Sequence, residues 1–112
     1  AIKGDRTELM QVILNILKNS IEAIDIYAVD KSISIIIINH TDILELQIKD
    51  SGKGFDDATG QKLFTRGFTT KSSGSGLGLD HCRGILESFG NTIDIISEGP
   101  GKGALTTIKF KI

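Results

Sequence analysis

Residues 52–84 are punctuated by glycine and end in Gly74-Ser75-Gly76-Leu77-Gly78-Leu79. Most of the chain's 13 glycines lie in this stretch. Glycine loses more backbone entropy on folding than any other residue, so such clustering needs a reason, and close approach of backbone N–H groups to an anion is one. The run opens onto residues 79–89, which have a helical pattern, and a helix N-terminus suits phosphate because its N–H groups are free. A flexible surface loop is the alternative for this stretch alone.

Composition restricts the class of protein. The chain has 112 residues, the length of one domain. Its formal net charge of −1 argues against a protein that binds nucleic acids or membrane surfaces in general, because such proteins are markedly basic. Cys82 is the single cysteine, so no internal disulfide can form and a reducing compartment is expected. No apolar run approaches the roughly 20 residues of a membrane span, and no signal peptide is recognisable. We therefore expect one cytoplasmic domain over residues 1–112, with no nucleic-acid partner and no direct membrane contact.

Residues 6–25 contain no glycine or proline and are predicted to form a helix, with Asp5 as its N-cap. One stripe about 100° wide is polar and includes Asn15, Lys18 and Asn19, while nearly all the rest is apolar, so we expect this helix to be buried on most sides. A solvated strip is the ordinary interpretation. However, Asn15 and Asn19 are four residues apart and share one face, where two carboxamide oxygens could bind a hard cation such as Mg²⁺.

Alternating and β-branched patterns predict the remaining elements. Strands are expected at 32–39, 44–50, 92–97 and 104–112, a short helix at 56–63, and a short edge strand at 1–4. Two long helices with four or five strands predict a two-layer α/β sandwich.

Asp50 ends the second of these strands and opens the segment Asp50-Ser51-Gly52-Lys53-Gly54-Phe55. A turn capped by the aspartate is the structural interpretation. The functional interpretation is a carboxylate that binds a base, beside glycines that let a flat ligand approach the backbone. An ionised aspartate only accepts hydrogen bonds, so it would bind the exocyclic amine of adenine and repel the carbonyl of guanine.

The segment before the glycine run combines aromatic, hydroxyl and cationic residues without a regular period. Phe64 and Phe68 are interpreted as a small hydrophobic clamp, and Arg66 and Lys71 as cations that can neutralise a nucleotide. Residues 64–73 are therefore predicted to form a mobile lid. The two histidines, at positions 40 and 81, are interpreted as surface residues.

Three blocks in this order resemble the histidine kinases. Residues 8–23 resemble the N box, residues 50–54 resemble the G1 box, and residues 63–79 resemble the F box, ATP lid and G2 box. The resemblance is to the catalytic, ATP-binding (HATPase_c) domain of bacterial two-component sensor histidine kinases, within the Bergerat-fold (GHKL) ATPases that include gyrase, Hsp90 and MutL. It implies a mixed sheet of about five strands with helices on one face.

The same resemblance implies roles for particular residues. Asn19 and Asn15 would be the catalytic residues and hold Mg²⁺ on the phosphates of ATP, Asp50 would bind the adenine amine, and Gly52 and Gly54 would shape the adenine pocket. Gly74, Gly76 and Gly78 would let the lid and the helix start lie against the phosphates. Further nucleotide contacts are implied at Lys18, Phe55, Phe64, Arg66, Thr70, Lys71, Ser75, Leu77, Leu79 and Thr107.

Two positions bear on which member of the superfamily this is. Glu22 stands where many relatives have a cation that contacts phosphate, which leaves Lys18, Arg66 or Lys71 for that contact. Gyrase, Hsp90 and MutL carry a glutamate at the position of Asn15, and that glutamate orients or deprotonates the attacking water. Because asparagine is no general base, we expect a protein histidine kinase. The alternatives are an ATP hydrolase and a degenerate nucleotide-binding or interaction module.

The resemblance also implies partners. A kinase of this type transfers the γ-phosphoryl group to a histidine on a separate helical dimerisation domain, and neither His40 nor His81 lies in such a context. We therefore expect the whole protein to be a histidine kinase that is itself a phosphoprotein. This chain would be a single-domain fragment of it, and the isolated domain is expected to be monomeric. It would act with a response regulator, either in the cytoplasm or as the cytoplasmic part of a membrane-bound sensor.

Overall fold

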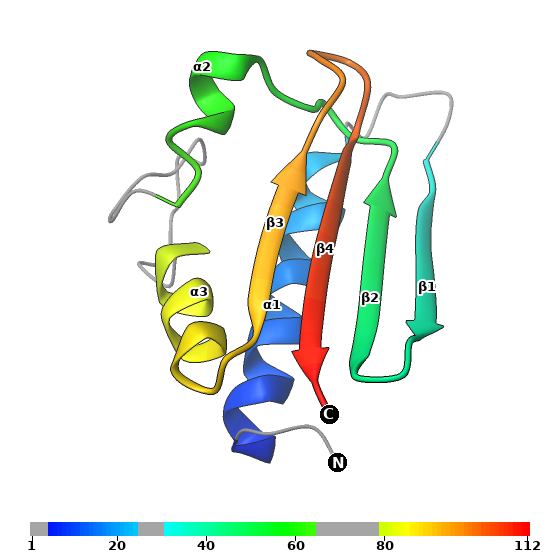
Figure 1. Cartoon of the computed structure of the whole chain (residues 1–112). Coiled ribbons are helices and arrows are strands. Elements are labelled where there is room, and N and C mark those ends of the chain that lie inside the picture. The colour runs from blue at the N-terminus through cyan, green and yellow to red at the C-terminus, as the bar shows by residue number, and fades with distance from the viewer. Residues whose placement is uncertain (1–4, 25–30, 65–78) are drawn as a thin grey trace.

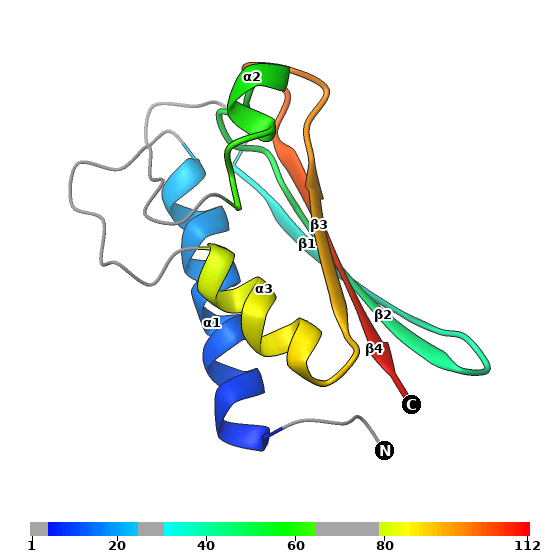
Figure 2. The ribbon, with the colours of Figure 1, turned by 60° about the vertical axis from the view of Figure 1, so that its left-hand side comes forward.

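The computed structural model describes residues 5–24, 31–64 and 79–112, and these residues form two layers. One layer is a sheet, and helices α1 and α3 pack on one of its faces (Figures 1 and 2). The predicted two-layer α/β sandwich is therefore confirmed. The elements in chain order are α1 (Arg6–Ala23), β1 (Ile33–Asn39), β2 (Ile43–Asp50), α2 (Asp57–Gly60), α3 (Leu79–Ser88), β3 (Thr92–Ile96) and β4 (Ala104–Lys111).

The sheet has the strand order β1-β2-β4-β3, and every neighbouring pair is antiparallel. The expected sheet was mixed and had about five strands, whereas the described residues hold four strands and no parallel pair. No parallel pair forms among these strands because β4 lies between β2 and β3 and is antiparallel to both. The expected edge strand at 1–4 lies outside the described residues. Because β2 and β3 run in the same direction, their carboxyl ends meet at the same end of the sheet.

Helix α1 begins at the predicted cap, where the carboxylate of Asp5 accepts a hydrogen bond from the N–H of Glu8 at 3.0 Å. Its inner face contributes Val12 and Ile16 to a core that α3 and the sheet complete. The other buried core members are Leu46, Ile48, Cys82, Leu86, Ile93, Ile108 and Phe110.

The expectation that α1 is buried on most sides is wrong. Met10, Leu14 and Ile21 are between 55% and 61% exposed, although they lie among the apolar positions of the helix. In a two-layer fold the sheet covers one side of α1 and α3 covers one flank (Figure 2), and no described element covers the opposite flank. Apolar periodicity identifies which residues could be buried, but the number of layers decides which of them are.

Strand β1 forms one edge of the sheet in the described part of the chain. Its residues Ile35, Ile36 and Ile37 are each about half exposed or more, and the strand carries no charged residue. An uncharged apolar edge strand is prone to pair with another strand. None of the described helices is long and apolar enough to cross a membrane.

Candidate nucleotide site at the carboxyl end of β2

Asp50 is the last residue of β2 and is only 5% exposed. Its Oδ1 accepts a hydrogen bond from the N–H of Gly52 at 2.9 Å, so the carboxylate is fixed by a turn of its own chain. Within the described ranges no other residue donates to this carboxylate. The predicted turn and the predicted site are thus the same feature, because the turn uses one carboxylate oxygen and leaves the second available as an acceptor.

The loop after Asp50, residues 51–55, is fastened to the turn between β3 and β4. The carbonyl of Gly52 accepts from the N–H of Gly103 at 3.0 Å, and the carbonyl of Lys53 accepts from the N–H of Gly101 at 2.6 Å. The N–H of Phe55 donates to Oγ of Ser97 at 3.2 Å. We call these two segments the aspartate loop (residues 51–55) and the β3–β4 turn (residues 97–103).

The contact between these segments explains why Gly54 is a glycine. Its φ is +60°, and a Cβ there would come within 2.7 Å of Oγ of Ser97 and 2.9 Å of the carbonyl oxygen of Gly103. The sequence predicted that glycines in this loop would allow a ligand to approach the backbone. At Gly54 the observed close approach is that of the β3–β4 turn.

Asn15 and Asn19 lie on the half-buried flank of α1. The side-chain amide of Asn15 donates to Sγ of Cys82 on α3, at 3.7 Å. Cys82 is buried, and burial is the main reason why the pKa of its thiol is raised. Asn15 therefore lies where α1 meets α3, and Asn19 lies one turn nearer the end of the helix that β2 also reaches (Figure 1).

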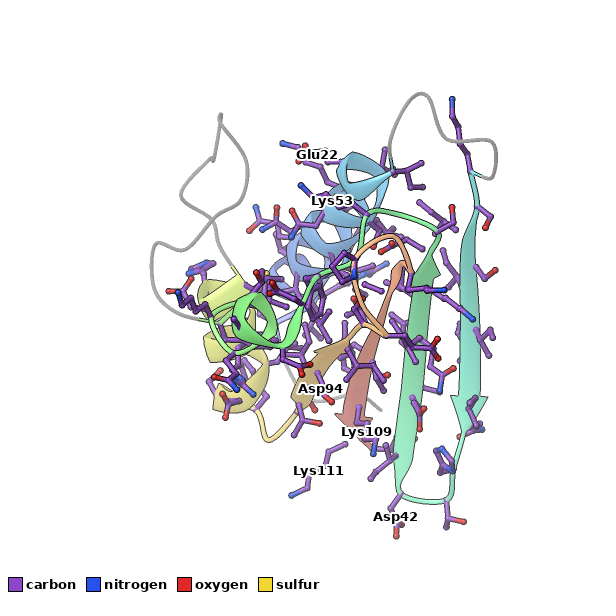
Figure 3. All side chains as sticks on the ribbon, turned by 90° about the horizontal axis from the view of Figure 1, so that it is seen from above. Glu22, Asp42, Lys53, Asp94, Lys109 and Lys111 are labelled. Atoms are coloured by element: carbon purple, nitrogen blue, oxygen red, sulfur yellow. The ribbon has the colours of Figure 1, made fainter. Side chains whose placement is uncertain are left out.

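Lys18, a candidate phosphate ligand, forms an ion pair with Glu22 at 3.9 Å. The side chain of Lys18 is 65% exposed, and ion pairs in such positions are weak. Its ammonium group therefore remains available to an anion. Seen from above, Glu22 and Lys53 of the aspartate loop both lie on the helix side of the sheet (Figure 3).

Phe64 is held by a residue that the sequence analysis did not single out. The guanidinium carbon of Arg83 on α3 lies 4.1 Å from the centroid of the Phe64 ring, and Nε of Arg83 lies 3.5 Å from a carboxylate oxygen of Glu87. Phe64 is half-buried against the core. Phe64 thus makes a cation–π contact with Arg83, whereas the predicted clamp also needs Phe68, which lies outside the described residues. A cation in the first turns of α3 could have indicated the contact with Arg83.

Thr107 is not brought together with Asp50. In the sheet it is paired with Gln47 and Asp94, and Figure 3 shows Asp94 on the face away from α1. The helix-facing position beside it belongs to Thr106, which is 4% exposed and was not predicted. The alternation of buried residues that continues through Ile108 could have identified Thr106.

Many predicted nucleotide-binding residues cannot be placed, because they lie outside the described residues. These are Arg66, Thr70, Lys71, Gly74, Ser75, Gly76, Leu77 and Gly78, together with Phe68 of the expected clamp. Leu79 begins α3 and is half-buried.

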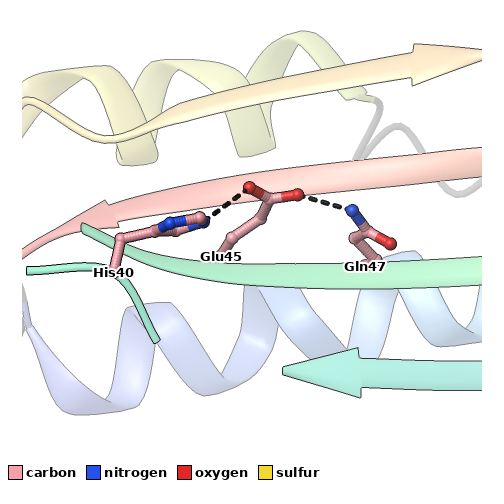
Figure 4. Close-up of polar contacts among 3 residues, drawn as sticks. All are labelled: His40, Glu45 and Gln47. Atoms are coloured by element: carbon pink, nitrogen blue, oxygen red, sulfur yellow. Dashed lines mark hydrogen bonds and ion pairs between the residues drawn. The ribbon is translucent and has the colours of Figure 1, made fainter. Parts of the chain in front are cut away.

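A second polar cluster runs from the turn before β2 to the middle of that strand (Figure 4). A ring nitrogen of His40 lies 3.2 Å from Oε1 of Glu45, and the side-chain amide of Gln47 donates to Oε2 of the same carboxylate. The hydrogen bonds from Gln47 and His40 lower the pKa of Glu45. Glu45 and Gln47 alternate along β2 with the residues that share the face of Asp50, so they lie on the opposite face and we do not assign this cluster to the nucleotide site. His40 and His81 are both exposed, as predicted.

Curated proteins similar to this chain are sensor kinases. Sensor histidine kinase ZraS of Klebsiella oxytoca is 40% identical over 112 residues, which are 99% of this chain and 23% of that protein. The histidine-protein kinase AtoS of Escherichia coli strain K12 is 38% identical over 99% of this chain and 18% of its own length. Sensor protein FixL of Bradyrhizobium diazoefficiens is 32% identical over 89% of this chain and 20% of its own length. The chain thus spans about a fifth of the length of these relatives.

Solved structures agree with this similarity. The nucleotide-free catalytic domain of histidine kinase ThkA superposes with a TM-score of 0.81 at 29% identity, over 98% of this chain and 70% of that one. ThkA in complex with the response regulator TrrA superposes with a TM-score of 0.75 at 27% identity, over 98% of this chain and 30% of that one. The mycobacterial kinase MprB, at 23% identity and a TM-score of 0.83, supports the fold alone; it covers 98% of this chain and 74% of that one.

The family model described as histidine kinase-, DNA gyrase B- and HSP90-like ATPase matches residues 4–112. This match covers nearly the whole chain and includes Asp50 and the two asparagines of α1. The resemblance that the ordered sequence blocks indicated is thereby confirmed. The chain belongs to the histidine kinase-, DNA gyrase B- and HSP90-like ATPase family, and within it is similar to the sensor histidine kinases.

Proposed function

We propose that this chain binds Mg-ATP and donates its γ-phosphoryl group to a histidine on a separate dimerisation domain of a two-component sensor kinase. The observation that carries the proposal is the state of Asp50, a buried carboxylate with one oxygen fixed by Gly52 and the other available. Similarity to named sensor histidine kinases over almost the full chain supports the choice of reaction.

Asp50 would select adenine by its hydrogen-bonding capacity. Its free oxygen can accept from the exocyclic amine of adenine, whereas the carbonyl that guanine carries there would face a second acceptor. At a buried position the wrong base also leaves polar groups unpaired, which costs more than it would in water. The fixed turn at Gly52 keeps the carboxylate from rotating to avoid this conflict.

The described residues fit a Mg²⁺ site in which the phosphates of ATP supply part of the ligands. Mg²⁺ in nucleotide sites usually takes one or two protein oxygens and otherwise phosphate and water oxygens. Asn19, with Asn15 one turn earlier, would supply carboxamide oxygens on the half-buried flank of α1. The bound ion would neutralise charge on the phosphates, and Lys18 would add a cation from the same flank. Arg66, Lys71 and the three glycines before α3 remain predicted ligands.

The chemistry proposed is in-line phosphoryl transfer. A histidine nitrogen forms a bond to the γ-phosphorus while the bond from that phosphorus to the bridging oxygen breaks, and ADP leaves. This chain contributes positioning and charge neutralisation. Asn15 cannot take a proton from water, so the bound ATP would be spared hydrolysis until the histidine arrives. The dimerisation domain and a response regulator are the proposed partners, and the cytoplasmic part of a sensor is the proposed setting.

Calorimetry with ATP, ADP and GTP, with and without Mg²⁺, tests the nucleotide site. We expect wild type to bind the adenine nucleotides at micromolar concentrations and Asp50→Asn to lose at least roughly tenfold in affinity, because an amide replaces one acceptor by a donor. Asp94→Asn is the matched control, since it makes the same change on the opposite face of the sheet. Failure of wild type to bind ATP would exclude the proposed activity and leave the degenerate module.

Transfer itself is tested with the full-length kinase. Labelled ATP is expected to yield a phosphohistidine that is stable to base and labile to acid, and Asn19→Ala is expected to abolish it. ATP turnover without a phosphorylated histidine would indicate a hydrolase instead.

A further inference from the structure

We propose that Ser97 is a positioning residue of the adenine site, whose hydroxyl locks the aspartate loop to the β3–β4 turn and thereby fixes Asp50. This inference rests on the proposed function, because it assumes that Asp50 reads the base. Ser97 directly follows β3 and is half-buried.

The hydroxyl of Ser97 is saturated with backbone partners. It accepts from the N–H of Phe55 at 3.2 Å and from the N–H of Gly99 at 3.2 Å. It lies 2.6 Å from the carbonyl oxygen of Gly103 and 3.1 Å from that of Gly99. A serine hydroxyl has one hydrogen to donate and two lone pairs, so both acceptor positions are used and the hydrogen goes to the nearer oxygen, that of Gly103.

Gly103 carries this constraint to Asp50. Its N–H donates to the carbonyl of Gly52, the residue whose own N–H holds Oδ1 of Asp50. Gly103 is buried, has a φ of +68°, and lies so close to the carbonyl of Asp50 that a Cβ could not be fitted between them. The Ser97 hydroxyl, Gly103, Gly52 and the Asp50 carboxylate therefore form one continuous chain of contacts.

The other end of the aspartate loop is held by the same oxygen. Phe55 is bonded to Ser97 directly, and Gly54 leaves a space that Oγ of Ser97 fills, since a Cβ on Gly54 would lie only 2.7 Å from it. Both ends of the loop thus depend on one hydroxyl that touches no part of the expected nucleotide. Small displacements of a positioned group are costly to recognition, so Ser97 is expected to affect which base is bound.

The direct test compares ADP and GDP binding by wild type, Ser97→Ala and Ser88→Ala. Ser88 is the matched control, because its hydroxyl also bonds to a backbone carbonyl, that of Ile85, but on the exposed side of α3. We expect Ser97→Ala to lower the affinity for ADP on the order of tenfold and to reduce the preference for ADP over GDP. Ser97→Thr keeps the hydroxyl and is expected to restore the preference. Ser88→Ala should match wild type in both respects.

A second measurement needs no nucleotide. Amide hydrogen exchange of Gly52 reports the bond to Asp50, and we expect Ser97→Ala to exchange faster at Gly52 while the amides of the sheet centre keep their protection. If Ser97→Ala does not fold, Ser97→Cys provides the same comparison, since a thiol is a weak donor and a weak acceptor.

The outcomes separate the two proposals. Failure of wild type to bind ADP would overturn the proposed function, and Gly52 exchange would still decide whether Ser97 positions the loop. A folded Ser97→Ala variant with unchanged base preference and unchanged exchange at Gly52 would overturn the role of Ser97. Equal losses for ADP and GDP, with unchanged exchange at Gly52, would overturn it as well.

Discussion

The side-chain amide of Asn15 donates a hydrogen bond to Sγ of Cys82, 3.7 Å away, and so joins α1 to α3. The sulfur is buried, and its raised pKa keeps it protonated at neutral pH, where it serves as a weak neutral acceptor. Residue 15 is therefore held at the junction of two helices, and the family resemblance implies that it corresponds to the glutamate of gyrase, Hsp90 and MutL. A glutamate there would differ from Asn15 by one methylene and by a carboxylate, a potential general base, in place of the carboxamide.

The Asn15→Glu variant is expected to gain ATP hydrolysis, because a carboxylate at this position can accept a proton from an attacking water. General base catalysis typically contributes about 10² to 10⁴ in rate, so a rise of roughly tenfold or more over wild type should be measurable by phosphate release. Asn15→Gln is the matched control, since it adds the same methylene without a base. A glutamate variant that still binds Mg-ATP but hydrolyses no faster would remove the argument that asparagine protects ATP.

The buried thiol of Cys82 predicts a dependence of stability on pH. Burial raises the folded-state pKa, so the unfolded chain ionises first, at about pH 8.5, and stability that is fully present below that pH is lost as the pH rises further. Denaturant unfolding of wild type should show this loss as the pH rises above about 8.5. Cys82→Ala is expected to be less stable at pH 7, because it leaves a cavity, but to show a shallower decline. Parallel declines in both proteins would assign the effect to other groups.

The contact between Arg83 and Phe64 is expected to stabilise the fold modestly. A double-mutant cycle with Arg83→Met and Phe64→Leu should give a coupling free energy of about 0.5 to 1 kcal/mol, the range for a partly exposed cation–π pair. Methionine keeps most of the apolar stem of arginine and removes its charge. Glu87→Gln controls for the ion pair that Arg83 also makes. A coupling within error of zero would mean that the two side chains are merely adjacent.

Most elements of this fold were predictable because their signals are local. The cap at Asp5 and the alternation that ends at Asp50 each depend on a few neighbouring residues. The family resemblance was predictable too, because its blocks are short and ordered.

Features set by tertiary contacts were not predictable. Ser97 and Phe55 are 42 residues apart, and no local pattern in either segment predicts their hydrogen bond. The resemblance implies a nucleotide contact at Thr107, but adjacent strand residues face opposite sides, and it is Thr106 that shares the face of Asp50. Likewise, the apolar residues of α1 gave no indication that Leu14 would lie on the uncovered flank.

The exposed edge of β1 predicts self-association of the 112-residue chain, in contrast to the monomer that the resemblance implies. Ile36 lies in the middle of an uncharged strand, and unprotected edges of this kind pair with other strands. Ile36→Lys should therefore lower the concentration-dependent light scattering of the chain, because a buried ammonium would oppose pairing.

Ile96→Lys is the matched control for this edge. Ile96 is similarly exposed and lies on β3 at the other edge, where Asp94 already supplies a charge, so the same substitution is expected to change scattering little. A chain that stays monomeric up to millimolar concentration without any substitution would contradict the prediction.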